Sequence, residues 1–359
     1  MEQFPIRLPQ DGDYFRTSVE FLDNVIYSAT NISTKIDGRE VKVGTTHTFD
    51  LLLIICDYAQ YMYNKATNDG AEGLVECSFT MTDSQLNTLL KLNPVTQKIK
   101  KMDSKKLTTL KEQYIENFVK GVWCEQREEM EDGRYVIKNM PMFYYEIAYV
   151  SKTDKTPISY TVTLTPYGIS FLNKMFGYTQ GNSYSYYLVC LGMKLQAVSG
   201  KALLGVLCQY HNAIMKGKFN NGQPVRIDFK RLYTICGLND KNPSQNFTRL
   251  QEQLDKINKE LQILGFTDKQ GYPIKFTMKK VKDEKRKVLT DNLNAIRTIE
   301  FGYERIQGAK RVEPRSTLKL LYSEQPQTKK DEDKKTKATK ESKKEQTTKK
   351  RHNYFGDME

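Results

Sequence analysis

The sequence has few of the residues and motifs on which most enzymes and metal sites depend. Its three histidines, His47, His211 and His352, are too scattered to form a metal cluster, and His211 falls in an apolar stretch typical of a core. It contains no GxxxxGK[ST] phosphate loop, no HExxH motif and no CxxC pair. We therefore expect a protein that is not an enzyme, with no catalytic residues, no metal and no cofactor.

Long apolar segments and an export signal are also missing. No apolar run approaches the roughly 18–20 residues that span a bilayer, since Leu51–Cys56 stops at Asp57. The N-terminal MEQFPIRLPQ does not show the pattern of a leader peptide. The six cysteines stand singly, mostly in apolar contexts where a small buried side chain is expected. These features predict a soluble, cytoplasmic protein without a membrane partner.

What the sequence has in excess is positive charge. Lys and Arg number 56 against 43 Asp and Glu, a formal net charge of +13. Residues 329–351 carry 11 basic and 5 acidic side chains, which is +6 and less than half of the excess. The part of the chain that folds is therefore itself basic, and it should attract a polyanion such as nucleic acid.

The first half of the chain is predicted to hold two main helices and a hairpin. Apolar residues at helical spacing predict a helix from Thr48 to Lys65 and another from Lys105 to Gly121. Between them we expect a strand, Leu74 to Phe79, and a short helix capped by Thr82. Strands at 135–137 and 142–150 are predicted to pair as a hairpin, 160–164 is a further candidate strand, and 166–175 is a short helix.

The second half repeats this order. A helix over 197–216 is followed by a strand over 225–227 and by a short helix that Asp228 caps and Gly237 ends. Ser244 is predicted to cap a helix over 245–264, and Gly271 to lie in a hairpin between 263–266 and 274–278. A strand-like run follows at 296–303. The short helices also match, because Leu86, Leu89 and Leu90 stand at the same offsets from Thr82 as Leu232, Ile235 and Cys236 do from Asp228.

Helix, strand, helix, helix and hairpin is the order of a helix-turn-helix with a β-hairpin wing. The predicted fold class is α+β, with two tandem winged-helix domains and a disordered basic C-terminal tail. The tail lacks core-forming residues and consists of Lys, Glu, Thr and Gln. The expected domains are an N-terminal extension packed on the first domain (1–45), a first winged helix (46–176), a connector (177–195), a second winged helix (196–325) and the tail (326–359).

The predicted helix over 245–264 has one strongly apolar side and one polar side. Phe247, Leu250, Leu254, Ile257 and Leu261 form the apolar stripe, which leaves Gln245, Thr248, Arg249, Glu252, Lys256 and Lys259 facing away. Gln and Arg can bond base edges, and Lys can neutralise phosphate. A solvated helix face is the alternative, but the preceding short helix and the lysine-rich hairpin favour a DNA-reading helix. The other candidate DNA-binding residues in this domain are Lys230, Arg231, Lys269, Lys275, Lys279 and Lys280.

A lysine cluster marks the corresponding helix of the first domain. Its members are Lys98, Lys100, Lys101, Lys105, Lys106 and Lys111. Cations at the start of a helix oppose its dipole, and bound phosphate would offset that cost, although an exposed loop also tolerates it. We count these lysines as candidate DNA-binding residues.

Three stretches of the second domain resemble the plasmid replication-initiator (Rep) family with two tandem winged helices. They are Ser199-Gly200-Lys201 to Tyr210, Val225 to Leu232, and Phe247 to Leu261, where Ile257-Asn258-Lys259-Glu260 looks like a permuted form of the family's Glu-Ile-Asn ending. Ala202-Leu203-Leu204 stands where the family usually has an Arg-Leu-Tyr-like signature. The resemblance implies an initiator that binds directly repeated sites in double-stranded DNA through both domains, dimerises through the first domain and recruits host helicase or initiator proteins.

Two other functions fit the same residues. A winged-helix transcriptional regulator or nucleoid-associated protein would also bind duplex DNA, and direct repeats of about 20 base pairs beside an AT-rich stretch would favour the initiator instead. An RNA-binding or virion protein would use the basic tail and the Tyr-rich connector, and would prefer single strands.

Overall fold

A computed structural model describes most of the chain up to residue 313. The described residues are 13–36, 39–42, 46–86, 104–130, 134–154, 156–177, 184–216, 224–238, 243–268, 270–282 and 296–313. The chain divides into two units, residues 1–322 and 323–359, and all described residues lie in the first. The predicted tail lies outside them. The mixture of helices and antiparallel sheets confirms the α+β class, and no described helix is long and apolar enough to span a membrane.

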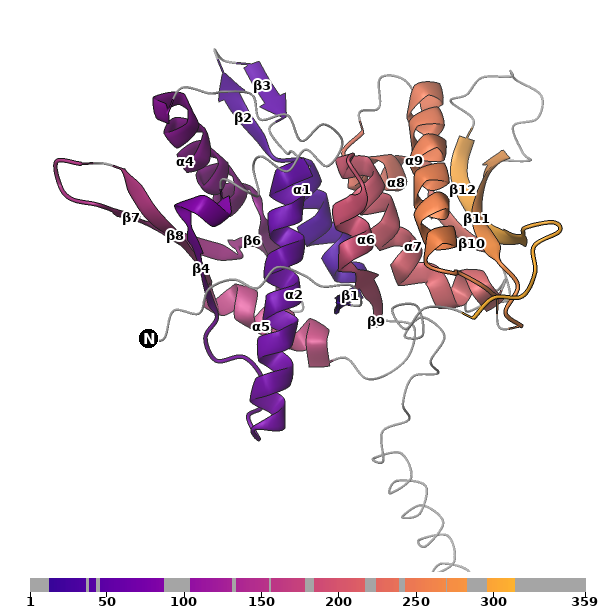
Figure 1. Cartoon of the computed structure of the whole chain (residues 1–359), viewed down its shortest axis with the longest axis horizontal. Coiled ribbons are helices and arrows are strands. Elements are labelled where there is room, and N and C mark those ends of the chain that lie inside the picture. Colours follow the sequence, from indigo (N-terminus) through magenta and orange to yellow (C-terminus); the bar gives the residue numbers. More distant parts are fainter. Residues whose placement is uncertain are drawn as a thin grey trace, which may run out of the picture. The chain divides into compact units, whose positions relative to one another are not determined.

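The first half of the chain builds one three-stranded sheet with its helices (Figure 1). In chain order it contains α2 (Thr46–Asn68), β4 (Ser78–Thr82), a helical turn at 83–86, α4 (Ser104–Gly121), the separate strands β5 (Trp123–Glu129) and β6 (Tyr135–Pro141), then β7 (Phe143–Tyr149), β8 (Pro157–Leu164) and α5 (Pro166–Gly177). The strands pair antiparallel in the order β4-β8-β7. The predicted cap is confirmed, because the Gln85 N–H donates to Thr82 Oγ1 (3.2 Å) while Gln85 Oε1 accepts from the Thr82 N–H (2.9 Å).

The second half repeats the order helix, strand, short helix, helix and two paired strands, without counterparts of β5, β6 and α5. It contains α7 (Val198–Lys216), β10 (Val225–Asp228), α8 (Phe229–Ile235), α9 (Pro243–Ile263), β11 (Ile274–Lys282) and β12 (Ile296–Arg305). The antiparallel sheet has the order β10-β12-β11. In both sheets, the strand that comes last in the sequence is therefore the central strand. The Asp228 cap is confirmed, since its carboxylate accepts from the Arg231 N–H at 2.8 Å.

The N-terminal segment packs against both halves. β1 (Tyr14–Ser18) pairs with β9 (Tyr184–Leu188), a strand that lies within the predicted connector. The chain continues from β9 directly into α6 (Val189–Lys194). Next come the π-helix η1 (Phe21–Ile26), α1 (Tyr27–Thr30) and a small hairpin of β2 (Ser33–Ile36) and β3 (Arg39–Lys42). Both η1 and α1 contact α8 of the second half. No pattern in the sequence of η1 and α1 predicts their contact with the second half.

One buried core joins the N-terminal segment and both halves. The rings of Phe15 and Tyr187 stack at 5.3 Å across the β1–β9 pair. A buried ion pair links the halves directly, with Lys201 Nζ on α7 lying 2.6 Å from Asp50 Oδ1 on α2. Breaking such a pair leaves a buried charge without compensation, so it resists separation of the two helices.

The cysteines confirm the expectation of small buried side chains. None of the six forms a disulfide; Cys190 is half-buried, and the buried ones are Cys56, Cys77, Cys124, Cys208 and Cys236. Burial raises the pKa of Cys124 to about 11 and that of Cys208 to about 12. They are thiols rather than thiolates at neutral pH, and are therefore poor nucleophiles.

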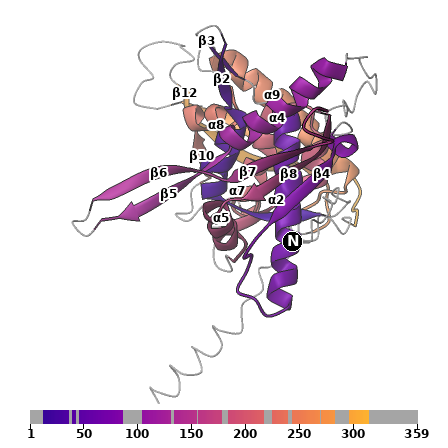
Figure 2. The same ribbon diagram turned by 90° about the vertical axis from the view of Figure 1, so that its left-hand side faces the viewer.

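The predicted hairpin between 135–137 and 142–150 is wrong. The first of these strands lies in β6 (Tyr135–Pro141), which pairs with the unpredicted β5 (Trp123–Glu129), whereas β7 pairs with β8. The chain changes sheets at the buried Met142, whose N–H bonds Val122 and whose carbonyl accepts from Thr165. The β5–β6 hairpin projects from the body (Figure 2). Glu128 and Glu129 lie at the end of β5.

Two predictions at the ends of α9 are also wrong. The helix begins at Pro243, so Ser244 lies inside it and does not cap it; proline suits a first turn, where its missing N–H costs nothing. At the other end, Ile263 is still helical, so 263–266 is not a strand. Around Gly271 the described residues form the antiparallel bridge Thr267–Pro273, and the Ile274 N–H donates to the Phe266 carbonyl at 3.2 Å. The strand that pairs along the length of β11 is β12, and not the segment 263–266.

Candidate nucleic-acid interface

The polar side of α9 is exposed along the helix, as predicted. Leu250, Leu254, Ile257 and Leu261 are buried and Phe247 is half-buried against the core. The six residues expected to face outward, Gln245, Thr248, Arg249, Glu252, Lys256 and Lys259, are all exposed. The orientation of the helix is thus confirmed, and contact of these residues with DNA stays a prediction.

A buried asparagine fixes the rotation of α9. The Asn258 amide donates to the Phe276 carbonyl at 2.9 Å and accepts from the Phe276 N–H at 2.8 Å, so it clamps the helix to β11. The sequence did not predict this contact of Asn258 with β11. The available signal was its position beside Ile257 in the apolar stripe, where a polar side chain needs a partner.

The lysines of β11 lie beside the start of α9, but they differ in what they contact. The Lys280 ammonium lies 4.4 Å above the ring of Phe247, in the first turns of the helix. Lys275 pairs with Glu304 at 2.8 Å, and Lys279 is exposed opposite Glu300. Lys280 is therefore the lysine of β11 best placed beside α9, because Lys279 lies on the opposite face of the sheet. Lys269 lies outside the described residues.

Arg231 is engaged by the N-terminal segment. Its guanidinium donates to both carboxylate oxygens of Asp23, at 2.8 and 2.7 Å from Nη2, and also bonds Tyr210. The neighbouring Lys230 is exposed. Sequence analysis grouped both as DNA-binding residues; the carboxylate already neutralises Arg231, so Lys230 is the more available cation.

The lysines of the first half are only partly described. Lys105, Lys106 and Lys111 lie in α4, which confirms the predicted helix but leaves their side-chain contacts open. Lys98, Lys100 and Lys101 lie outside the described residues. A role of this cluster in DNA binding stays a prediction.

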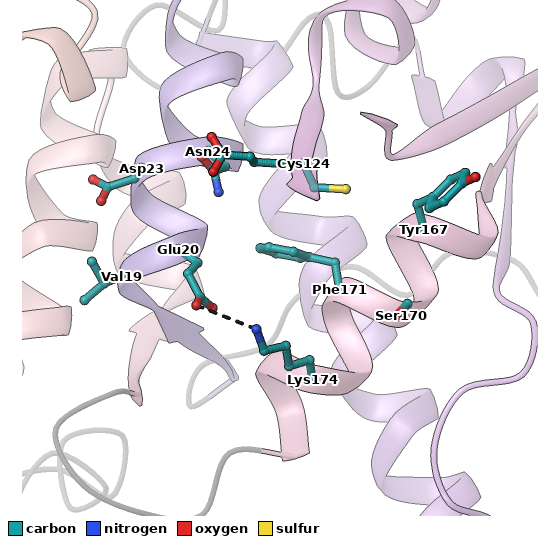
Figure 3. A pocket seen from close by; sticks show the side chains of 10 residues that line it. Val19, Glu20, Asp23, Asn24, Cys124, Tyr167, Ser170, Phe171 and Lys174 are labelled. Carbon is teal, nitrogen blue, oxygen red and sulfur yellow. Dashed lines mark ion pairs between the residues drawn. The ribbon is translucent and has the colours of Figure 1, made fainter. Parts of the chain in front are cut away.

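A pocket of about 400 Å³ lies elsewhere, between η1, β5 and α5 (Figure 3). Phe171 projects into it from α5, and Lys174 pairs with Glu20 at 3.7 Å. Glu20, Asp23 and Glu125 give its lining more negative than positive charge. Phosphate would be repelled there, so the polar side of α9 is the better candidate for a nucleic-acid interface.

His211 has a structural place in the core, as expected. It packs against Phe266 and Phe276, with ring centroids 5.9 and 6.3 Å away. Burial lowers the pKa of its imidazole to about 4, so it is neutral at pH 7. Within the described ranges, no group of three His, Cys, Asp or Glu side chains converges as metal ligands would.

Comparison with known proteins finds similarity among solved structures only. No protein-family model and no curated protein sequence matches the chain. Among solved structures it is similar to that of the Pi initiator protein in complex with iteron DNA, with 12% sequence identity and a TM-score of 0.46. The match covers 83% of this chain and 100% of that chain. The relationship is one of fold, and a distant one.

Proposed function

We propose that this chain is a non-enzymatic, sequence-specific double-stranded-DNA-binding protein with two tandem winged-helix domains. The observation that carries the proposal is the polar side of α9, which is exposed over its whole length. Asn258 fixes the rotation of the helix, and Lys280 of β11 lies beside its first turns. The repeated element order and strand order support it. In helix-turn-helix proteins, the helix in the position of α9 enters the major groove.

The residues along α9 divide by chemistry. Gln245 and Arg249, in the first turns, suit bidentate bonds to adenine and guanine, and Glu252 can accept from a cytosine amino group. Lys256 and Lys259 follow further along the helix and suit phosphates. We therefore expect the N-terminal turns of α9 to read bases and its later turns to position the helix on the backbone.

The biological role that we propose is replication initiation at directly repeated sites, with recruitment of host helicase or initiator proteins. It rests on the resemblance of 199–210, 225–232 and 247–261 to the Rep family. Direct repeats of about 20 base pairs next to the coding region would support it; an isolated palindrome would favour a transcriptional regulator.

We also propose a homodimer formed through the first half. Among the described strands, β7 lies at an edge of its sheet, and its sequence FYYEIAY contains no lysine or proline. Lysines on edge strands discourage pairing, and the edge strand β11 has several. Tyr144, 55% exposed on β7, is a residue to test. Tyr144→Lys should shift sedimentation toward monomer, whereas the control Ile158→Lys on the inner strand β8 should not; equal effects would contradict pairing through β7.

The DNA-binding proposal is tested by site selection followed by substitution of Arg249. Selection from random duplexes should return one preferred sequence. Arg249→Ala should then weaken binding to it by about 1–3 kcal/mol and relax selectivity at one base position. The matched control is Gln262→Ala, an exposed change near the C-terminal end of the same helix, which should alter binding little.

Two results would oppose this assignment. If Arg249→Ala weakens specific and random DNA equally, Arg249 contacts phosphate. If neither affinity changes, α9 does not read the DNA. In all cases the folding of the variant should be nearly unchanged, within about 0.5 kcal/mol, because the side chain is exposed.

A further inference from the structure

One short segment, Tyr27–Ile32, lies between α4 and α8, the helix that precedes α9 in the chain. Figure 1 shows α1 between α4 and α8, and α1 contacts both. The segment comes from the N-terminal part of the chain and is far in sequence from the second half. Its contacts on each side are made at the ends of helices, where small movements change helix direction.

On the first side, the segment touches the C-terminal end of α4. A Cβ added to Gly121, the last residue of α4, would lie 2.5 Å from Ile32 Cγ1, so only glycine allows this close approach. Just beyond, the Trp123 N–H donates to Ser28 Oγ at 3.3 Å, and the rings of Tyr27 and Trp123 meet edge to face at 6.2 Å. The end of α4 is thus held by backbone approach, a hydrogen bond and ring packing.

On the other side, the segment caps the C-terminal end of α8. The Thr30 hydroxyl donates to the Ile235 carbonyl at 2.8 Å, and the Asn31 amide donates to the Thr234 carbonyl at 2.9 Å. These carbonyls belong to the last turn of the helix, where the regular backbone donors of the helix end. The Thr234 carbonyl also accepts from the Gly237 N–H at 3.0 Å. Asp23, just upstream, adds the paired bonds to Arg231 on the same helix. The turn that leads from α8 to α9 therefore starts from a fixed point.

We propose that Tyr27–Ile32, together with Asp23 just upstream, is a brace that fixes α9 relative to α4. This inference rests on the proposed function. Under it, the protein binds only DNA sites in which the parts contacted by the two halves are separated by a fixed number of base pairs. The buried pair of Lys201 and Asp50 and the β1–β9 pairing join the same two halves, and the brace adds control of the two helix ends. Thr30, Asn31 and Asp23 act as positioning residues that need not touch DNA.

A distance measurement tests the brace without DNA. Spin labels at Lys120→Cys on α4 and Lys259→Cys on α9 are attached to the full chain with the half-buried Cys190 replaced by Ser. The parent protein should give one narrow distance distribution. Thr30→Val with Asn31→Ala removes both capping donors and should broaden it, whereas Thr30→Ser keeps the hydroxyl and should not.

DNA binding then provides a readout that loss of stability alone would not move. The selected site is compared with versions that carry one to five base pairs inserted between its two contacted parts, because about five base pairs is half a helical turn. For the parent protein, one inserted base pair should lower affinity about tenfold or more, and the braceless double variant should lose a smaller factor.

The outcomes separate the brace from the proposed function. The brace is overturned if the parent protein gives a broad distribution of spin-label distances. It is also overturned if the double variant keeps a narrow distribution and loses as much affinity as the parent when base pairs are inserted. If the parent selects no DNA sequence, the proposed function fails while the distances still decide on the brace. Should the double variant not fold, Asp23→Asn decides in its place, because that ion pair is exposed and its loss leaves the core intact.

Discussion

Lys201 and Asp50, which are 151 positions apart in the chain, form a buried ion pair between α7 and α2. The Lys201 side chain is 0% exposed, and its Nζ also donates to the Gly192 carbonyl at 2.7 Å. Burial raises the pKa of Asp50 to about 6, and the ammonium of Lys201 opposes that rise. Burial likewise lowers the pKa of Lys201. Each group is held in its charged form by the other.

We predict that Lys201→Met lowers the free energy of unfolding at neutral pH by about 3–5 kcal/mol, because it leaves a buried carboxylate unpaired. Urea denaturation measures the change. The double variant Lys201→Met, Asp50→Leu should recover much of the loss, since no buried charge remains. If the double variant is as unstable as the sum of the two single variants, the pair is not coupled.

His211 should make stability depend on pH. Its pKa is about 4 when folded and about 6.5 when unfolded, so between these values the unfolded chain binds more protons. The free energy of unfolding therefore rises with pH across this window. As pH falls from about 6.5 to about 4, the contribution of His211 to stability, at most about 3 kcal/mol, is lost. Urea melts of the parent protein and His211→Gln between about pH 4 and pH 7 isolate the effect.

The parent protein must be compared with His211→Gln because Asp50 changes stability with pH in the opposite direction. Its folded pKa, about 6, lies above the usual 3.8, so its contribution falls as pH rises through that range. A difference between parent and His211→Gln that does not change with pH would contradict the prediction for His211.

Gly237 should be hard to replace, since it turns the chain from α8 toward α9. Its φ is +68°, and an added Cβ would lie 2.9 Å from the Thr30 carbonyl oxygen. Gly70, with φ +90° and nothing within 4 Å, is a matched control that isolates backbone strain. Gly70→Ala should cost about 1–2 kcal/mol in a urea melt and Gly237→Ala more. Equal costs would show that the approach of Thr30 does not matter.

The lysine cluster before and in α4 should contribute mainly to salt-dependent affinity. Replacing Lys100, Lys101, Lys105 and Lys106 by Gln should reduce the slope of log affinity against log salt by up to about 3–4, without changing the preferred sequence. A matched control replaces the exposed lysines Lys65, Lys152, Lys194 and Lys310. An unchanged slope in the first variant would remove the first half from the DNA-binding surface.

Apolar periodicity and helix caps were enough to predict much of the second half. The stripe from Phe247 to Leu261 fixed which side of α9 is exposed, and Asp228 marked the start of α8 within one residue. Both signals are local, because they depend on residues within a few turns of one another. The same local signals placed α2, α4 and α7.

The sequence could not predict contacts between distant residues. β5, with the sequence WCEQREE, has no apolar alternation, and it is a strand because β6 pairs with it. The Asp23–Arg231 pair and the bond from Thr30 to Ile235 join residues more than 200 positions apart. Such partners are selected by tertiary packing, which leaves no spacing to read in the chain.

The buried thiols make the chain its own reporter of opening. Disulfide exchange needs a thiolate that the reagent can reach, so each buried cysteine reacts only when the structure around it opens. Cys56, Cys77 and Cys124 lie in the first half, whereas Cys208 and Cys236 lie in the second. The rates at which these two groups react with an added disulfide therefore give separate opening free energies for the two halves, in the unmodified protein, with or without DNA.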